Sequence, residues 1–398
     1  VLSLGGVNIS AATGSPMTDA AEVPVPEGYC ELDYLKLYAF LEMADADGVK
    51  NGTKLNENYD PTDPTTWGTT NEEGESTITW LEVTTGEGED EVTLQYLLTF
   101  NAPASDLCGQ LDLSGCKFLR EVYVQNNTLT QVDVSESAIQ QLDCSGNRLT
   151  ELNASGCGFL MNLVCGNNQL TALELANCRR LATVDCSGNQ LTALNLSATN
   201  ALLTLNCKNN RLSTLTFNSM SYPIHVDCSG NQLTELNTDT MQFTRYLDCS
   251  DNQLTRLNVR NCSVVETFSC QGNKLERLDL TSDGKYHALS LNAIGEGYVG
   301  YAMEQKEDGA TTYTVVATPV EGSVFQGWYT NRDCTTLVTT NSTIDVTEIA
   351  PADAKDYYAK FDEGGGAVEV PKGYNVNDYL KLRTFLEQTD EEGVKNGF

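Results

Sequence analysis

The stretch LATVDCSGNQLTALNL, residues 181–196, decides the fold because its spacing recurs along the middle of the chain. Val184 and Cys186 alternate with Asp185, which is the two-residue period of a short strand with an apolar inner face and a polar outer face. Asn189 follows at a turn, where a carboxamide can donate and accept hydrogen bonds and so satisfy backbone groups. Asparagines recur at this position of the repeat. The first interval is 20 residues and the six that follow are 21 residues each, which gives Asn127, Asn147, Asn168, Asn189, Asn210, Asn231, Asn252 and Asn273. A fixed period of this length predicts a solenoid.

The unit resembles the leucine-rich repeat, since its fixed positions read L-x-x-V-x-C-x-x-N-x-L-x-x-L-x-L from Leu181 to Leu196. We therefore predict an α/β solenoid, a leucine-rich repeat with short parallel β-strands. It covers residues 107–284 in about eight 21-residue repeats. Because each coil contacts only its neighbours, both ends of the solenoid need covers.

The chain has 14 cysteines, and most of them follow the repeat. Seven occupy the inner strand position, namely Cys144, Cys165, Cys186, Cys207, Cys228, Cys249 and Cys270. A second column lies eight residues before the matching strand position, at Cys116, Cys157, Cys178 and Cys262. We predict free, buried thiols in both columns, because a thiol fills space like a small apolar group and parallel strands hold such side chains about 4.8 Å apart. The alternative is a metal site, which the absence of any C-x-x-C disfavours, and we predict no metal. Cys30, Cys108 and Cys334 lie outside both columns and stay undecided.

The beginning of the chain is copied at its end. Gly28–Gly52 aligns with Gly373–Gly397 at an offset of 345 residues, and 16 of the 25 positions are identical. Tyr34, Leu37 and Leu41 have helical spacing, so we predict a short amphipathic helix within a helical N-terminal cap of residues 26–106. Residues 1–25 are interpreted as a tether and residues 373–398 as the start of a second, truncated cap in a tandem array.

One segment of the predicted cap has two interpretations. Asp45 and Asp47, followed by Gly48, faintly match a calcium-binding loop. Met43 and Lys54 occupy positions where such a loop requires acids, so we favour an ordinary turn.

The repeat ends near residue 284, and a different sequence pattern follows. Three segments have the composition of strands: TYTVVATP at 312–319, GSVFQGWY at 322–329 and YYAKF at 357–361. These segments resemble the B-repeat of listerial internalins and the related Listeria–Bacteroides repeat over roughly 75 residues. The resemblance implies a small β-rich, β-grasp-like spacer domain at 285–362, and a glycine-rich linker follows at 363–372. Trp328 and Tyr329 could form a sugar-stacking platform, but their place in the family's motif favours packing in the core.

The net negative charge and the absence of catalytic motifs disfavour several classes of partner and activity. The 24 lysines and arginines stand against 55 aspartates and glutamates, and a net charge of −31 disfavours nucleic acid and anionic lipid as partners. No apolar run has the length of a membrane span. With two histidines, His225 and His287, and no catalytic or phosphate-binding motif, we expect neither an enzyme nor a cofactor.

The candidate site is the outer face of the strands. Its proposed binding residues are Asp143, Asp185, Asn206, His225, Asp227, Arg245, Tyr246 and Asp248. Small polar residues dominate this face, and its anchor-like side chains, Arg, His and Tyr, come late in the array. The resemblance implies a secreted or cell-surface bacterial protein, expected to be a monomer, that binds an extracellular protein or glycan, host-derived ligands included. The alternative is a structural spacer in a tandem array, in which Asp and Ser only solvate the strands.

Overall fold

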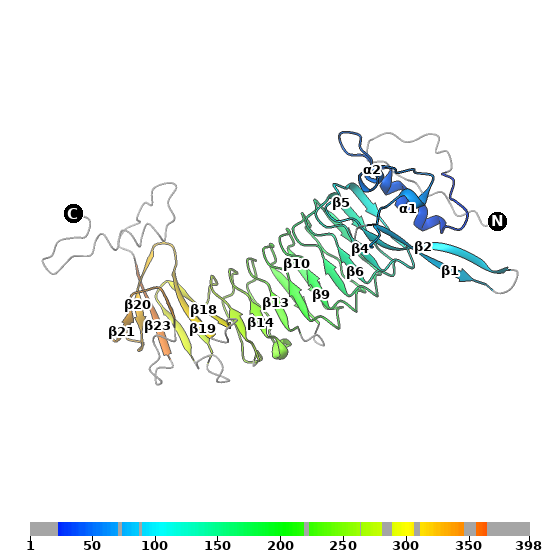
Figure 1. Ribbon diagram of the computed structural model, residues 1–398. Helices are drawn as coiled ribbons and strands as arrows, with labels where there is room; N and C mark the ends of the chain where they lie inside the picture. The colour runs from blue at the N-terminus through cyan, green and yellow to red at the C-terminus, as the bar shows by residue number, and fades with distance from the viewer. Residues whose placement is uncertain are drawn as a thin grey trace.

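The computed structural model describes residues 23–70, 74–86, 90–218, 223–262, 264–280, 289–305, 311–345 and 356–363. Most of the predicted tether, the linker beyond residue 363, the second cap copy and His287 lie outside the described residues. Figure 1 shows a row of stacked coils with helix α1 at one end and strands β18–β23 at the other.

Eight short parallel strands form the body of the solenoid. They are β4 (Glu121–Tyr123), β6 (Gln141–Asp143), β8 (Asn162–Val164), β9 (Thr183–Asp185), β11 (Thr204–Asn206), β13 (His225–Asp227), β14 (Tyr246–Asp248) and β15 (Thr267–Ser269). Their register repeats the sequence period, since Thr204 pairs with Thr183 on one side and with His225 on the other. One 21-residue unit is therefore one coil, which confirms the predicted solenoid of about eight turns.

Further strands of the coils belong to separate sheets. β3 (Cys108–Asp112), β5 (Thr128–Asp133) and β7 (Glu151–Asn153) form a three-stranded parallel sheet, and β10 (Ala193–Leu196) pairs with β12 (Thr214–Phe217). Between the strand sets lies a continuous core in which Leu191, Leu205 and Cys207 have no exposed surface.

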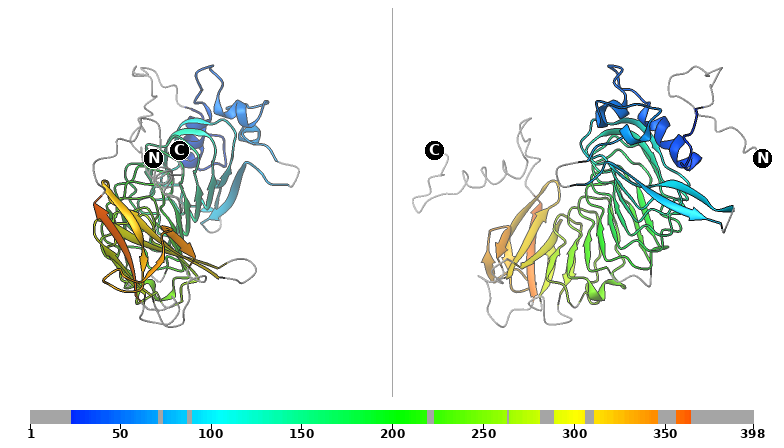
Figure 2. Two further views of the ribbon diagram at one scale, coloured as in Figure 1. Left: turned by 90° about the vertical axis from the view of Figure 1, so that its left-hand side faces the viewer. Right: turned by 45° about the vertical axis from the view of Figure 1, so that its right-hand side comes forward.

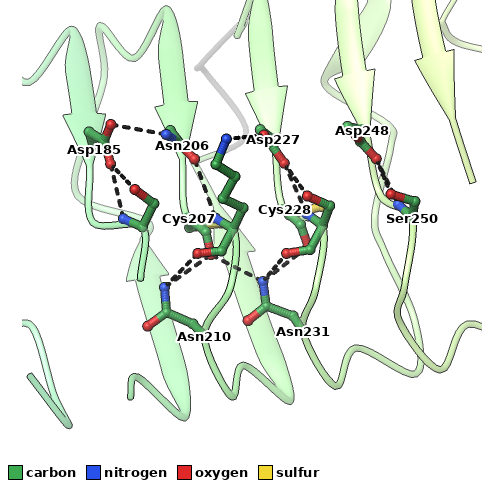
Figure 3. Close-up of polar contacts among 12 residues, drawn as sticks. Asp185, Asn206, Cys207, Asn210, Asp227, Cys228, Asn231, Asp248 and Ser250 are labelled. Atoms are coloured by element: carbon green, nitrogen blue, oxygen red, sulfur yellow. Dashed lines mark hydrogen bonds and ion pairs between the residues drawn. The ribbon is translucent and has the colours of Figure 1, made fainter. Parts of the chain in front are cut away.

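The asparagine at the end of each strand joins neighbouring coils. Asn210 Nδ2 donates to the carbonyl oxygens of Cys186 at 3.0 Å and Cys207 at 3.1 Å, and Oδ1 accepts from the N–H of Leu191 at 3.0 Å. Asn231 repeats the arrangement one coil later: Nδ2 donates to the carbonyl oxygens of Cys207 and Cys228 (Figure 3), and Oδ1 accepts from the N–H of Leu212. The predicted role of the asparagines in satisfying backbone groups is confirmed.

The eleven cysteines of the two columns are buried, as predicted, and all fourteen are free thiols. Burial disfavours the thiolate and raises the pKa of Cys178, Cys186 and Cys270 to about 12. The remaining three cysteines, Cys30, Cys108 and Cys334, are half-buried.

We expect iodoacetamide at about pH 8 to label only Cys30, Cys108 and Cys334 in the native protein, because a reactive thiol must be accessible and ionised. In denaturant all fourteen cysteines react. Peptide mass spectrometry after timed labelling measures this difference. Rapid native labelling of Cys186 or Cys207 would contradict the buried thiol column.

Helix α1 (Glu31–Leu41) lies against one end of the coils and buries Tyr34, Leu37 and Phe40. α2 (Asn51–Leu55) and a 3-10 turn, η1 (Pro64–Thr66), follow it. The Asn51 side chain joins this segment to the first coil, because Nδ2 donates to Phe40 O and Cys108 O and Oδ1 accepts from Cys108 N.

The hairpin of β1 (Ile78–Thr85) and β2 (Val92–Asn101) continues the sheet of the solenoid. β2 pairs in parallel with β4, and the hairpin projects beyond the coils in Figure 2. The buried Asp33 carboxylate of α1 accepts a hydrogen bond from the N–H of Leu97 at 2.9 Å, which fixes the helix on β2.

The segment after α1 is a turn. Asp45 Oδ1 accepts from the N–H groups of Asp47 and Val49, and its Oδ2 lies 2.8 Å from Lys54 Nζ. An ammonium group therefore occupies the place where a calcium loop would need a further oxygen, which agrees with the turn interpretation. Throughout the described ranges, no three histidine, cysteine, aspartate or glutamate side chains are grouped as metal ligands.

The last strands form two sheets across the predicted domain division at residue 284. The five-stranded sheet has the order β16 (Arg277–Asp279), β17 (Ser290–Ile294), β23 (Asp356–Glu363), β20 (Ser323–Tyr329) and β21 (Leu337–Thr339). The solenoid sheet continues through β18 (Gly297–Gln305), β19 (Thr311–Pro319) and β22 (Thr343–Asp345). β18 runs antiparallel to β15, with Phe268 opposite Met303, and so covers the last coil.

Trp328 belongs to the core of the five-stranded sheet. Its ring has no exposed surface, packs edge-to-face on Phe325 and donates from Nε1 to Ser342 O. The predicted packing is confirmed for Trp328, which offers no face to a sugar, whereas Tyr329 is only half-buried.

Candidate binding face

The strand face consists of the outward side chains of the eight parallel strands and of the two residues that follow each strand. Four of its aspartates build a turn with the serine two residues later: Asp143 with Ser145, Asp185 with Ser187, Asp227 with Ser229 and Asp248 with Ser250. In each pair Oδ1 accepts from the serine N–H at 2.9–3.1 Å and from its hydroxyl at 2.6–2.7 Å. Figure 3 shows the pairs of Asp185, Asp227 and Asp248. These aspartates therefore hold the chain as it leaves the strand, and their second oxygens stay available for other contacts.

Polar side chains also connect neighbouring strands across this face. Asn206 Nδ2 donates to Asp185 Oδ2 at 2.9 Å, and Lys208 Nζ lies 3.6 Å from Asp227 Oδ2. Asp227 is almost buried, with 6% of the residue exposed, whereas Lys208 is more accessible. The simple picture of a solvated polar face is therefore incomplete, because its residues bond to one another.

Asp248, unlike its neighbour Asp227, has no cation beside it among the described ion pairs. In the part of the chain that the structure describes, the ion pairs do not include Asp248. Burial raises its pKa, the hydrogen bonds from Ser250 act in the opposite direction, and the like charges of Asp227 and Asp251 add to the rise. This end of the strand face therefore carries negative charge that no neighbouring side chain neutralises.

Two aromatic rings lie beside these carboxylates. His225 and Tyr246 begin adjacent strands and stack with their ring centroids 4.1 Å apart and their planes parallel within 1°. Burial lowers the pKa of His225, and the nearby Asp227 only partly compensates, so the imidazole is neutral at pH 7. Burial and the charges of Asp248 and Asp227 raise the pKa of Tyr246 to about 12. The two rings thus form an uncharged platform next to two anions.

The structure brings together some of the sequence-predicted residues. Asn206, His225, Asp227, Tyr246 and Asp248 lie on the adjacent strands β11, β13 and β14, and Asp185 lies next to them on β9. Asp143 is set apart, because Val164 on β8 interrupts the acidic column between β6 and β9. Arg245 precedes β14, is exposed, and pairs with Glu266 at 3.0 Å.

Sequence reasoning missed the row of residues directly before the strands, which we call the lateral edge. It consists of Met161, Ala182, Leu203, Ile224, Arg245 and Glu266, joined in series by hydrogen bonds from each N–H to the preceding carbonyl. Leu203 is 47% exposed and Ile224 is 41% exposed. A position-by-position comparison of the coils would have shown this signal, because Gln140 and Ala182 occupy the same place in earlier coils.

Comparison with known proteins gives partial similarities. No protein-family model matches the sequence, and no curated protein does. The functional domain of InlJ from Listeria monocytogenes, whose description includes a cysteine ladder, is 26% identical over 48% of this chain and 54% of that one, with a TM-score of 0.41. YopM from Yersinia enterocolitica is 24% identical over 42% of this chain and 40% of that one, with a TM-score of 0.33.

YopM from Yersinia pestis, described as a leucine-rich effector protein, is 19% identical over 47% of this chain and 60% of that one, with a TM-score of 0.34. This chain thus spans between 40% and 60% of the three similar proteins. The assignment of a solenoid rests on the parallel register and the asparagine ladder of the chain itself. Among its described residues, no helix has both the length and the apolar character needed to cross a bilayer.

Proposed function

We propose that this protein is a recognition module that binds a protein or glycan on its strand face. The observation that carries the proposal is the juxtaposition on β13 and β14 of the stacked His225–Tyr246 pair with Asp227 and Asp248. Hydrogen bonds to the following serines hold both carboxylates in place, so a partner meets a preorganised surface and little side-chain freedom is lost on binding.

The location and relatives of the module are part of the same proposal. The resemblance of its sequence segments to internalins supports a secreted or cell-surface bacterial protein. It also supports a capping role for residues 26–106 and a B-repeat-like, β-grasp-like domain at residues 285–362. We propose that it works as a monomer without cofactor or catalytic group, because recognition by an exposed face needs neither.

A structural spacer is the second candidate. The observation that favours it is the continuity of the thirteen-stranded sheet from β1 to β22, which joins the terminal segments and the coils in one body. A rigid body of this kind can hold another domain away from a surface.

The two functions are separated by neutralising Asp185, Asp227 and Asp248 together with asparagine. Asparagine keeps the acceptor oxygen for the serine N–H, as Asn153 does for Ser155, whereas a lysine would remove it. We expect binding to a partner found on an array of matrix proteins, mucins and glycans to weaken by about tenfold or more, since a charged contact is lost at three places. Surface plasmon resonance with and without calcium measures the change.

A matched control removes the same charge elsewhere, with Asp106→Asn, Asp133→Asn and Asp239→Asn, none of which lies in the eight parallel strands. Equal binding by both triple variants would remove the aspartates from the site. Silence of the unmodified protein across the whole array would favour the spacer.

A further inference from the structure

The exposed apolar side chains of the solenoid gather on one side. Among the described residues from 107 to 280, the large hydrophobic side chains with substantial exposure are Phe159, Leu203, Ile224 and Phe243. Leu203 and Ile224 directly precede strands β11 and β13, and the two phenylalanines lie two residues before the lateral edge in their own coils. Exposed apolar residues normally occur singly, so four that lie on the lateral edge or two residues before it mark an interaction surface.

Leu203 and Ile224 are the centre of this surface. The N–H of Ile224 donates to Leu203 O at 2.8 Å, which places the two side chains on adjacent coils about 4.8 Å apart. The residues that precede them, Leu202 and Pro223, are buried. The exposure of Leu203 and Ile224 is therefore confined to this one position of each coil and is not shared by the preceding residue. Phe159 contributes less apolar surface, because the guanidinium of Arg180 lies 5.1 Å from its ring centroid.

The aliphatic pair leads directly into the aromatic pair and the carboxylates. His225 follows Ile224 in the chain and stacks on Tyr246, and Asp227 and Asp248 end the same two strands. Leu203, Ile224 and the two rings therefore form one apolar strip whose inner border is acidic.

The charges around this strip are unbalanced. Arg245 on the lateral edge is paired with Glu266, and Lys208 faces Asp227 at 3.6 Å. Asp248 has no cation among the described ion pairs, and the lowered pKa of His225 keeps that ring neutral at pH 7. Lys208 faces one of the two carboxylates and leaves the other unpaired, so the neighbour that suits this site in a complex is a cation.

We propose that the lateral edge at Leu203 and Ile224 docks a partner protein segment in which an aliphatic or aromatic side chain stands next to a lysine or arginine. The apolar side chain covers Leu203 and Ile224, and the cation reaches across the two rings to Asp248. This inference rests on the proposed recognition function and deepens it, because it names the chemistry of the partner and adds an edge that lies outside the strands.

The probe is a displayed library of random peptides of about twelve residues, selected on the immobilised full chain. We expect enrichment of peptides that pair an apolar residue with Lys or Arg. By fluorescence anisotropy, Leu203→Ser with Ile224→Ser should weaken the best peptide by roughly tenfold, because the apolar area it covers is lost. The matched control is Val92→Ser with Leu337→Ser, which removes side chains of similar exposure, 51% and 52%, outside the solenoid.

The outcomes separate this inference from the broader function. Peptides that bind the edge variant as well as the control variant, but lose binding when Asp185, Asp227 and Asp248 are neutralised, would leave recognition by the strand face standing and overturn the edge. Enrichment of acidic peptides would also overturn the proposed partner chemistry. A library that yields no binding peptide would count against both proposals. Circular dichroism of each variant ensures that loss of binding is not loss of fold.

Discussion

Raising the pH from about 8 to about 10.5 is expected to unfold the solenoid in a steep transition. Seven cysteines of the inner column, Cys144, Cys165, Cys186, Cys207, Cys228, Cys249 and Cys270, have no more than 1% exposure. Burial raises the pKa of each thiol, to about 12 for Cys186 and Cys270. In the unfolded chain the same thiols ionise near pH 8.5, at about the value of a free cysteine.

The direction of the effect follows from the raised pKa values. Below about pH 8.5 the thiols are protonated in both states and the full stability is present. Above that pH only the unfolded state releases protons, so each thiol lowers the free energy of unfolding by about 1.4 kcal/mol per pH unit until its folded pKa is reached. Seven thiols together lower it by about 10 kcal/mol per pH unit, which is comparable to the whole stability of an ordinary domain.

The transition is measured by far-ultraviolet circular dichroism and by thiolate absorbance during an alkaline titration. Both signals are expected to change together. Cys186→Val with Cys228→Val should reduce the slope by about 3 kcal/mol per pH unit, since two of the seven protons are removed. Valine is a suitable replacement because Val124 occupies this position in an earlier coil. Thiolate absorbance that rises near pH 9 while the dichroism stays constant would show that the column is accessible.

Asn210→Ala is expected to lower the free energy of unfolding by about 2–6 kcal/mol. The substitution removes the acceptor for the Leu191 N–H and one of the two side-chain donors to each of the carbonyls of Cys186 and Cys207. The Leu191 N–H is left without a partner in the interior between coils, which costs roughly 1–3 kcal/mol. The carbonyls of Cys186 and Cys207 each lose one of two donors and keep the other, Asn189 or Asn231, so each lost hydrogen bond costs about 0.5–1.5 kcal/mol. The loss is large because one carboxamide joins neighbouring coils.

Urea denaturation followed by circular dichroism measures the change. The matched control is Asn195→Ala, because Asn195 is exposed and its side chain accepts a single hydrogen bond, from the Ser197 N–H at 3.0 Å. We expect that control to cost about 1 kcal/mol or less. Equal destabilisation by both variants would mean that the ladder contributes no more than a surface turn.

The strand face shows the limit of prediction from a repeat. The phase of the repeat correctly placed Asp185, Asp227 and Asp248 on the outside of the strands, because the two-residue period fixes the direction of each side chain. It did not reveal that each carboxylate accepts from the serine two residues later, or that Asp227 is nearly buried. The first property depends on the local path of the chain after the strand, and the second depends on the neighbouring coils, which lie 21 residues away.

The sequence by itself determined the solenoid, the buried asparagines and the buried thiols, because one period of about 21 residues corresponds to one coil and the same contacts recur in each. The tertiary structure alone decided three features: the stacking of His225 on Tyr246, the cover of the last coil by β18, and the exposure of Leu203 and Ile224. Exposure depends on what the neighbouring coils leave uncovered. A leucine or isoleucine has the same identity in a sequence whether it packs in the core or faces a partner.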